Sequence, residues 1–372
     1  MANVYKKLDQ SDRVNSRTLL HEAIPITGTI PSGTYGDNNI KNYSHKYFQS
    51  VYDYPYLSSS ANHIMDVSVG FSADSPFSGT YGGMPVSASA KKINIYNQMA
   101  QVLMGYEEDA TSKTVKIRKF DSDGDLSTTG DKIEEAIFLC FSRLLVKDEI
   151  KKGSFTLSFL TGGTVADRTV ARSLYTVGDY GAATGYKVNS PAGEYGILYN
   201  DPSAAASSRV GLLFYQAGIA VLTASVITAS SPQGDVQFGA QNQTAVTPGG
   251  GVGSTAQTKS INNSFVSSTI QQMADGVRNV LYNVSFNNTT EVNSTIYFCR
   301  AHSSDFNYST NPTYLSGSKI RVKVNSTDTP VSYLTTVGLY SANNELLAVA
   351  KTSEPLKKTP NNEVTLRVRL DY

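Results

Sequence analysis

The clearest hydrophobic pattern in the chain is a strict alternation over its last ten residues, Glu363–Tyr372. One side of this segment carries only apolar residues, namely Val364, Leu366, Val368 and Leu370. A period of two residues is typical of an antiparallel strand with one face buried and the other in water. We therefore expect a strand here, with the C-terminus pinned in a sheet.

Helical spacing occurs at two places in the first half of the chain. Between Lys91 and Met104, apolar residues recur three or four positions apart. Between Asp131 and Ile150, a longer apolar stripe starts with acidic residues and is followed by Lys151, Lys152 and Gly153. This charge distribution complements the dipole of a helix. The spacing predicts two main helices, and a short third helix over Ser264–Asp275.

Most of the remaining apolar segments are short and bounded by turn residues, which indicates strands. They are Ile64–Phe71, Ser154–Leu160, Tyr195–Tyr199, Val210–Tyr215 and Ile219–Ser225. The predicted fold class is α+β, predominantly antiparallel β-sheet with two main helices in the N-terminal half and an inserted β lobe.

Composition shifts divide the chain into four predicted parts. Residues 1–60 are polar and irregular and form an extended N-terminal arm; residues 61–160 form a helix-containing α+β lobe. Residues 161–260 are rich in Gly, Ala and Ser and form the inserted β lobe, with the glycine run Gly249–Gly253 in its trailing loop. Residues 261–372 form a C-terminal β lobe that packs with 61–160.

Charge and composition exclude several function classes. The formal net charge is +1, so the chain has no electrostatic footprint for nucleic acid. No segment is long and apolar enough to predict membrane insertion. Charged residues make up only 17% of the chain and there are 23 Tyr, a balance that suits strands and protein–protein surfaces. A plain β-rich protein would show the same composition.

Candidate catalytic and metal-binding motifs are few. Asp121–Asp125 resembles a calcium loop, but its glycine is at the fourth place and Lys132 stands where a bidentate Glu belongs, which favours an acidic turn. Gly249–Gly253 lacks the Lys-Ser/Thr of a phosphate loop. Cys299 and His302 leave a Cys–His nucleophile open, without an evident fold context. We predict no catalytic, cofactor-binding or metal-binding residues.

The remaining candidates belong to interaction surfaces. A tyrosine cluster lies in the N-terminal arm, and basic residues lie on the polar faces of two C-terminal strands. Each group fits either a solvated surface of its own lobe or an anchor for a partner. The predicted interface residues are Tyr43, Tyr47, Tyr52, Tyr54, Tyr56, Arg321, Lys323, Arg367 and Arg369.

Several strings in the chain resemble virion proteins of contractile-tailed bacteriophages, with the nearest likeness to the T-even-like phages of marine cyanobacteria. The strings are Phe286–Arg300, Phe306–Thr313 and Thr335–Lys351, and more loosely Lys92–Gln101 and Ser142–Phe155. Within Thr335–Lys351, the pattern T-x-x-G-L-Y followed by E-L-L-A-V-A-K looks like a strand–turn–strand unit of phage baseplate and tail-fibre attachment domains. The resemblance covers about two-thirds of the chain.

This resemblance implies a structural role. The expected function is that of a baseplate wedge protein, which holds neighbouring subunits in register and takes part in the rearrangement that triggers sheath contraction. The expected partners are other tail and baseplate proteins and copies of the chain itself, in a virion tail assembled in the host cytoplasm. The resemblance also admits a neck, collar or tail-fibre connector protein. A receptor- or glycan-binding adhesin is a further alternative, and a tail-associated glycosidase is the least favoured.

Overall fold

The computed structural model describes residues 5–27, 39–54, 56–108, 113–126, 132–160, 174–224, 226, 265–266, 268–308, 315–316, 319–320, 323, 325 and 327–372. The chain divides into two compact units. Unit 1 combines Met1–Leu20 with Glu291–Tyr372, and unit 2 spans His21–Thr290. Both units are built mainly from antiparallel strands, as the alternation predicted. The glycine run Gly249–Gly253 lies outside the described residues.

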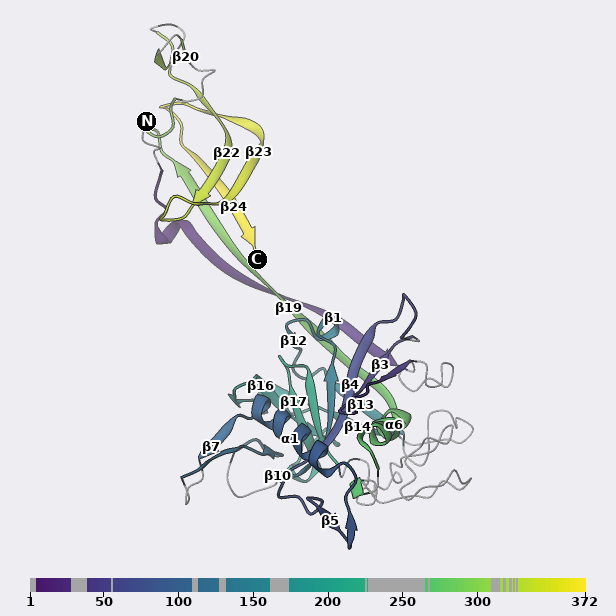
Figure 1. Cartoon of the computed structure of the whole chain (residues 1–372). Coiled ribbons are helices and arrows are strands. Elements are labelled where there is room, and N and C mark those ends of the chain that lie inside the picture. The colour runs from purple at the N-terminus through teal and green to yellow at the C-terminus, as the bar shows by residue number, and fades with distance from the viewer. Residues whose placement is uncertain are drawn as a thin grey trace. The chain divides into compact units, whose positions relative to one another are not determined.

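A single antiparallel sheet organises unit 2 (Figure 1). Its strands run in the order β1-β19-β13-β14-β16-β17-β18-β11-β4-β3-β2, with β12 beside β19 and β15 beside β16. Their bounds are β1 Arg13–Thr27, β2 Ile40–Asn42, β3 Gln49–Tyr52, β4 His63–Phe71, β11 Glu135–Phe141, β12 Glu149–Ile150, β13 Thr156–Leu160, β14 Leu174–Gly178, β15 Lys187–Ser190, β16 Gly193–Tyr199, β17 Arg209–Phe214, β18 Ile219–Thr223 and β19 Leu281–Ala301. The boundary between the two units falls within β1 and within β19.

Small hairpins and short helices complete unit 2. The hairpins pair β5 (Thr80–Tyr81) with β6 (Met84–Pro85), β7 (Tyr106–Glu108) with β8 (Val115–Ile117), and β9 (Phe120–Asp121) with β10 (Lys132–Ile133). The helices are α1 (Ser89–Leu103), α2 (Arg143–Val146), α3 (Ala182–Gly185) and α6 (Ile270–Val280), with a 3-10 turn η2 at Ala206–Ser208. No helix among the described residues combines the length and the apolar character that crossing a membrane requires.

The helix predicted over Asp131–Ile150 is wrong. Its central part is the strand β11, which pairs with β4 on one side and with β18 on the other, and only the single turn of α2 is helical. Both faces of β11 are buried, so the strand needs a continuous apolar run. A run of this kind also contains apolar residues at helical spacing, and its length of seven residues is the feature that indicates a strand.

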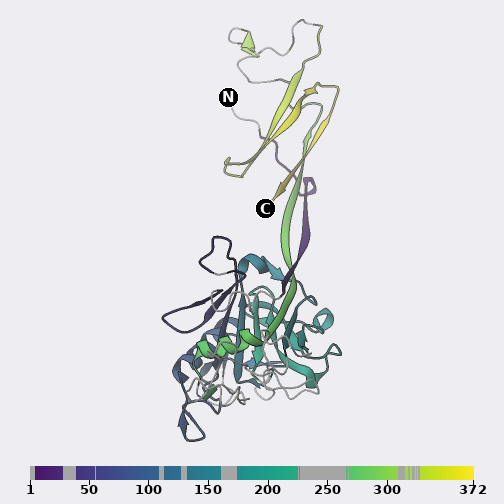
Figure 2. The same ribbon diagram turned by 90° about the vertical axis from the view of Figure 1, so that its right-hand side faces the viewer.

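The first predicted helix is present as α1, which covers one face of the sheet at β4 (Figure 1). α6 lies against the same sheet (Figure 2) and begins with a capping box in which Thr269 and Gln272 bond each other's backbone. Between α1 and the sheet, aromatic rings pack in a buried cluster that consists of Tyr96, Phe120, Phe138, Tyr195 and Phe214. This packing fixes α1 on the sheet.

The strands expected to form a separate inserted lobe are part of this same sheet. β16, β17 and β18 follow one another and join β11 directly, because Ala136 to Cys140 pair with Thr223 to Ile219. The change to small residues therefore marks a part of the sheet rather than a lobe of its own. The division predicted from composition does not separate these strands from their neighbours in space.

Unit 1 contains the C-terminal strands. β24 (Val364–Asp371) pairs with the second half of β19, and β22 (Ser332–Tyr340) pairs with β23 (Leu346–Lys358). The short strands β20 (Leu315–Ser316) and β21 (Lys319–Ile320) form a further pair, and the 3-10 turn η1 covers Gln10–Asp12. Along β24 the apolar residues are buried or half-buried and the polar ones are exposed, which confirms the predicted alternation.

Candidate interaction surfaces

The predicted tyrosines of the N-terminal arm gather at the β2–β3–β4 edge of unit 2. Tyr43 and Tyr47 both contact His45, and the rings of Tyr43 and His45 stack with a centroid separation of 5.1 Å. Tyr52 contacts Tyr56 with a centroid separation of 6.0 Å. Burial, followed by the neighbouring phenol of Tyr43, raises the pKa of Tyr52. The structure therefore brings most of the predicted cluster together on one edge.

The exposed side of this cluster is apolar and aromatic. Tyr54 and Tyr56 are exposed in the turn after β3, and Leu57 beside them is 85% exposed. The ammonium groups of Lys41 and Lys91 lie 5.1 and 5.5 Å from the ring centres of Tyr43 and Tyr47. Flat rings with polar edges can stack on a sugar or fill a pocket of a protein partner. We call this surface, formed by residues 41–54, 56 and 57, the tyrosine edge.

A chain of hydrogen bonds links the tyrosine edge to β4. The Tyr43 hydroxyl lies 3.2 Å from the hydroxyl of Ser50, which donates to Asp66, and Nε2 of His63 lies 2.9 Å from Oδ1 of Asp66. In a serine nucleophile the imidazole takes the hydroxyl proton. Here the carboxylate stands between the serine and the histidine, so the arrangement holds the edge together and does not activate Ser50.

The predicted basic residues of the C-terminal strands are placed only in part. Arg367 and Arg369 are exposed on β24, as their alternation predicted. The Arg369 guanidinium donates to Asp371 over 2.7 Å and to Ser294 over 3.1 Å, so its charge is already paired within the sheet. Lys323 is exposed and outside any strand, whereas Arg321 lies outside the described residues.

Unit 1 also exposes many apolar side chains that the sequence analysis did not single out. The exposed large apolar residues of this unit are Tyr5, Val14, Leu19, Leu20, Phe306, Tyr308, Tyr333, Tyr340, Leu346, Leu347, Val349 and Tyr372. By contrast, its buried apolar residues within the described ranges are Ala301 and Val368 alone. The continuous hydrophobic core runs from Ile40 to Phe286 and therefore belongs wholly to unit 2.

The densest part of this apolar surface is one face of the β22–β23 hairpin. Tyr340 and Leu346 pair across the hairpin. Both side chains lie close to the position that a Cβ atom on Gly338 would occupy. Leu347 and Val349 continue the surface along β23, and the Tyr5 ring lies 4.9 Å from the ring of Tyr340. We call Tyr340, Leu346, Leu347 and Val349 the hairpin face. The two adjacent leucines between Glu345 and Lys351 were the sequence signal for it.

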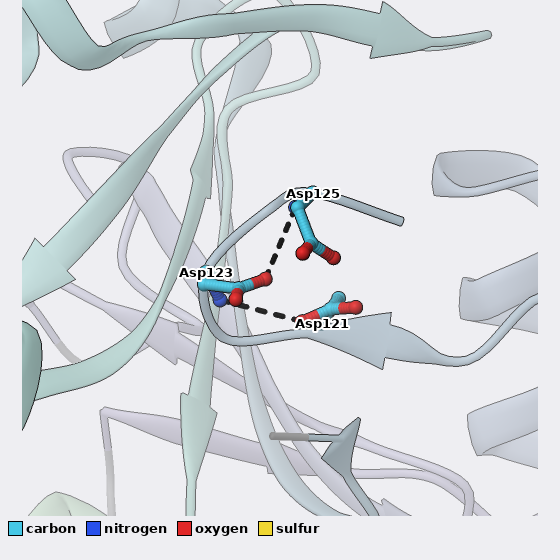
Figure 3. Close-up of side chains that lie close together, drawn as sticks. All are labelled: Asp121, Asp123 and Asp125. Carbon is cyan, nitrogen blue, oxygen red and sulfur yellow. Dashed lines mark hydrogen bonds between the residues drawn. The ribbon is translucent and has the colours of Figure 1, made fainter. Parts of the chain in front are cut away.

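The acidic loop predicted at Asp121–Asp125 follows β9 as a tight turn. One carboxylate oxygen from each of Asp121, Asp123 and Asp125 lies within 4.8 Å of the others. The backbone N–H of Asp123 donates to Asp121 over 3.4 Å, and that of Asp125 donates to Asp123 over 3.1 Å (Figure 3). These are the bonds of an Asx turn, in which a side chain closes the loop.

Cations of the chain itself face this cluster. Lys132 forms an ion pair with the fully buried Asp121, and Nη1 of Arg209 lies 3.7 Å from Oδ2 of Asp123. Burial raises the pKa of Asp121, although Lys132 opposes this shift, and a hydrogen bond with Asp121 lowers the pKa of Asp123. Because the protein supplies two counter-charges, the loop is better explained as an acidic turn than as a calcium site.

Calcium should therefore leave the stability of the chain unchanged. We expect millimolar calcium to shift the melting temperature by less than about 1 °C, since a ligand stabilises only the state that binds it. The measurement is a thermal melt followed by circular dichroism, with magnesium as the matched salt. A saturable rise in melting temperature that Asp123→Asn abolishes would instead establish a calcium site.

Cys299 and His302, considered as a nucleophilic pair, both lie in unit 1. Burial, and then the charge of Asp12, raises the pKa of the Cys299 thiol, which disfavours the reactive thiolate. Nδ1 of His302 lies 3.7 Å from Oε1 of Glu363. Burial also raises the pKa of Cys140 to about 12, and both cysteines are free. Neither thiol has the environment of an activated nucleophile.

An open pocket of about 270 Å³ lies where the first turn of α1 approaches the start of α6. Lys46, Lys91 and Thr269 contribute to its lining, which is otherwise mostly apolar. The Lys91 ammonium donates to the carbonyl of His45 over 3.1 Å. The pocket therefore adjoins the tyrosine edge through His45.

Comparisons with known proteins add no relative: no family model, no curated protein and no solved structure matches this chain.

Proposed function

We propose that the chain is a structural subunit of the tail of a contractile-tailed phage, most closely a baseplate wedge protein. In this role it holds neighbouring subunits in register and takes part in the rearrangement that triggers sheath contraction. Such a protein positions other subunits. It acts through the surface that it buries against its neighbours and not through a covalent reaction. The strings Phe286–Arg300 and Thr335–Lys351 favour a phage particle over other assemblies.

The observation that carries the assembly role is that the described residues of unit 1 form no hydrophobic core. Burial of apolar surface is the main favourable term in folding, and a single side chain such as Leu contributes about 1.5–3 kcal/mol when fully buried. Unit 1 buries Ala301 and Val368 among its described residues, while it exposes Leu346, Leu347 and Val349. An exposed apolar surface of this kind is typical of a protein interaction site. Neighbouring subunits would supply the burial that unit 1 does not provide for itself.

A paired experiment tests this role. We expect mass spectrometry of purified particles to find the chain at a fixed copy number, and gold-labelled antibodies to mark one end of the tail. Replacement of Leu347 by Asp should remove the chain from particles while the purified variant keeps its melting temperature, because this side chain is 67% exposed. Thr365→Asp on the exposed side of β24 is the matched control. A chain absent from mature particles would end the proposal.

The position of the label separates the structural alternatives. If the gold label marked the neck, the collar or the fibre attachment point, the chain would not be a wedge protein. Its role as a structural subunit of the tail would still hold.

The tyrosine edge favours one function of a different class, a receptor- or glycan-binding adhesin. Tyr54, Tyr56 and Leu57 offer an exposed aromatic and apolar surface of the type on which sugar rings stack. Saturable binding of host glycan to the purified chain, abolished by Tyr54→Ala with Tyr56→Ala, would support the adhesin. Without such binding, the same edge is better explained as an anchor against another subunit.

A further inference from the structure

The outer edge of β23 has no partner strand among the residues that the structure describes. β22 and β23 form a two-stranded sheet, and within the described part of the chain β23 pairs with β22 alone. An unpaired edge presents a row of free N–H and C=O groups, which readily accept another strand. The hairpin face next to this edge is exposed, with Leu347 at 67% and Leu346 and Val349 at 53% each. The same part of β23 therefore has both an unpaired backbone edge and exposed apolar side chains.

The available segment of this edge is short and has defined limits. The pairing of β23 with β22 is regular from Ala348 to Lys351, and its register shifts on both sides of this stretch, between Leu346 and Ala348 and again before Leu356. Pro355 lies in the interrupted stretch, and a proline has no N–H to donate to a neighbouring strand. We therefore place a partner strand before the proline, along Glu345 to Lys351, a segment whose first part contains the register shift between Leu346 and Ala348.

The charges of this segment are arranged symmetrically about Ala348. Glu345 and Lys351 each lie three positions from Ala348, and the residues between them are all apolar. In an antiparallel pair of two copies centred on Ala348, Glu345 of each copy stands opposite Lys351 of the other, and Leu347 stands opposite Val349. Opposite charges that face each other across a strand pair stabilise the pairing, and like charges destabilise it.

Neither charge is used elsewhere in the described part of the chain. Glu345 and Lys351 form no ion pair there, whereas Arg369 of β24 is already bonded to Asp371 and Ser294. On β24 one of the two exposed arginines is therefore already paired, and the exposed residues of this strand, Thr365, Arg367, Arg369 and Asp371, are all polar.

We propose that β23 pairs antiparallel with β23 of a second copy of this chain, about a twofold axis at Ala348. The two hairpins then form one four-stranded sheet, β22–β23 followed by β23–β22 of the second copy. Its ends carry two Glu345–Lys351 pairs, and at its centre Leu347 of each copy lies beside Val349 of the other. An interface of this kind is isologous, because each copy contributes the same surface. This inference rests on the proposed function for its biological setting. It adds to that function one partner, a second copy of the chain.

Charge reversal tests this pairing in the purified full-length chain. Sedimentation equilibrium should show a dimer for the unchanged protein. Glu345→Lys alone and Lys351→Glu alone should each weaken the dimer by roughly tenfold or more, because two like-charge pairs replace two opposite-charge pairs. The chain with both changes should recover the original affinity. Glu354→Lys, an equal charge reversal beyond the open segment, should leave the affinity unchanged.

Mixing the two single variants gives the sharpest test. In a heterodimer of the Glu345→Lys chain with the Lys351→Glu chain, every facing pair is again of opposite charge. We therefore expect dimers in the mixture although each variant alone is mainly monomeric. Recovery on mixing also shows that both variants are folded.

Three results would overturn the proposal: a monomeric unchanged protein, a dimer insensitive to both reversals, or no recovery in the mixture. These results concern pairing in solution, whereas the presence of the chain in particles tests the proposed function separately. A chain that is present in particles but monomeric in solution would refute the pairing and keep the assembly role. A chain that dimerises in solution but is absent from particles would refute the assembly role and keep the pairing.

Discussion

Replacement of Gly70 by Ala should lower the free energy of unfolding by about 3 kcal/mol, a large effect for the addition of one methyl group. A Cβ at Gly70 would lie 2.6 Å from the carbonyl oxygen of Lys92 and 2.9 Å from the backbone nitrogen of Tyr96. Both atoms belong to the backbone of α1, so the clash cannot be relieved by turning a side chain. The variant must push α1 away from β4 and loosen the aromatic cluster around Tyr96.

The measurement is urea unfolding followed by far-ultraviolet circular dichroism. Gly185→Ala is the matched control, because a Cβ there meets no atom within 4 Å. Its effect should stay within about 0.5 kcal/mol, as is usual for surface substitutions. If Gly70→Ala were as mild as the control, α1 would not pack on β4 as closely as described.

Stability should rise between pH 7 and pH 8.5 because of Lys92. This lysine is fully buried, and its ammonium donates to the carbonyls of Phe265 and Ser268 over 2.7 and 2.8 Å. Burial lowers the pKa of Lys92 to about 7. The unfolded chain, with a lysine pKa of about 10.4, then binds more protons than the folded chain above pH 7. Raising the pH therefore favours the folded state.

The rise should amount to about 1–2 kcal/mol across this range, since one group contributes at most about 1.4 kcal/mol per pH unit. The test compares urea unfolding of the unchanged protein with that of Lys92→Met, in which this contribution is absent. Lys91→Met, at the neighbouring position, should retain the rise. The pH stays at or below 8.5 because burial raises the pKa of Cys140 to about 12, and this group acts in the opposite direction at higher pH. Parallel curves for the unchanged protein and Lys92→Met would refute the prediction.

The half-buried strand β24 was recognisable from its alternation, whereas β11, which is buried on both faces, was predicted to be a helix. In β24, Val368 is buried, whereas Arg367 and Arg369 are exposed. The apolar or polar character of each residue therefore indicates which face of the strand it lies on. In β11, Ile137 and Phe138 point to opposite faces and both are fully buried. The apolar residues of β11 follow one another without a period of two. The choice between helix and strand is then decided by pairing partners that are distant in sequence.

The candidate surfaces divide in a similar way. The sequence supplied the tyrosines of the tyrosine edge, but the stacking of Tyr43 on His45 and the contact of Tyr52 with Tyr56 depend on how β2, β3 and β4 fold together. For the acidic loop, local turn chemistry was visible in the sequence. The approach of Arg209 to Asp123 required the tertiary structure, since β17 lies far along the chain.

By itself, the sequence determined the β-rich class, the helix α1, the alternating strand β24 and the turn at Asp121–Asp125, because each depends on neighbours a few residues apart. Only the tertiary structure decided that, among the residues it describes, the hydrophobic core lies in unit 2, and that the hairpin face of unit 1 is exposed. Burial is a property of the folded surface. An apolar residue such as Leu347 has the same hydrophobicity in a core and on an open strand, and only its surroundings distinguish the two.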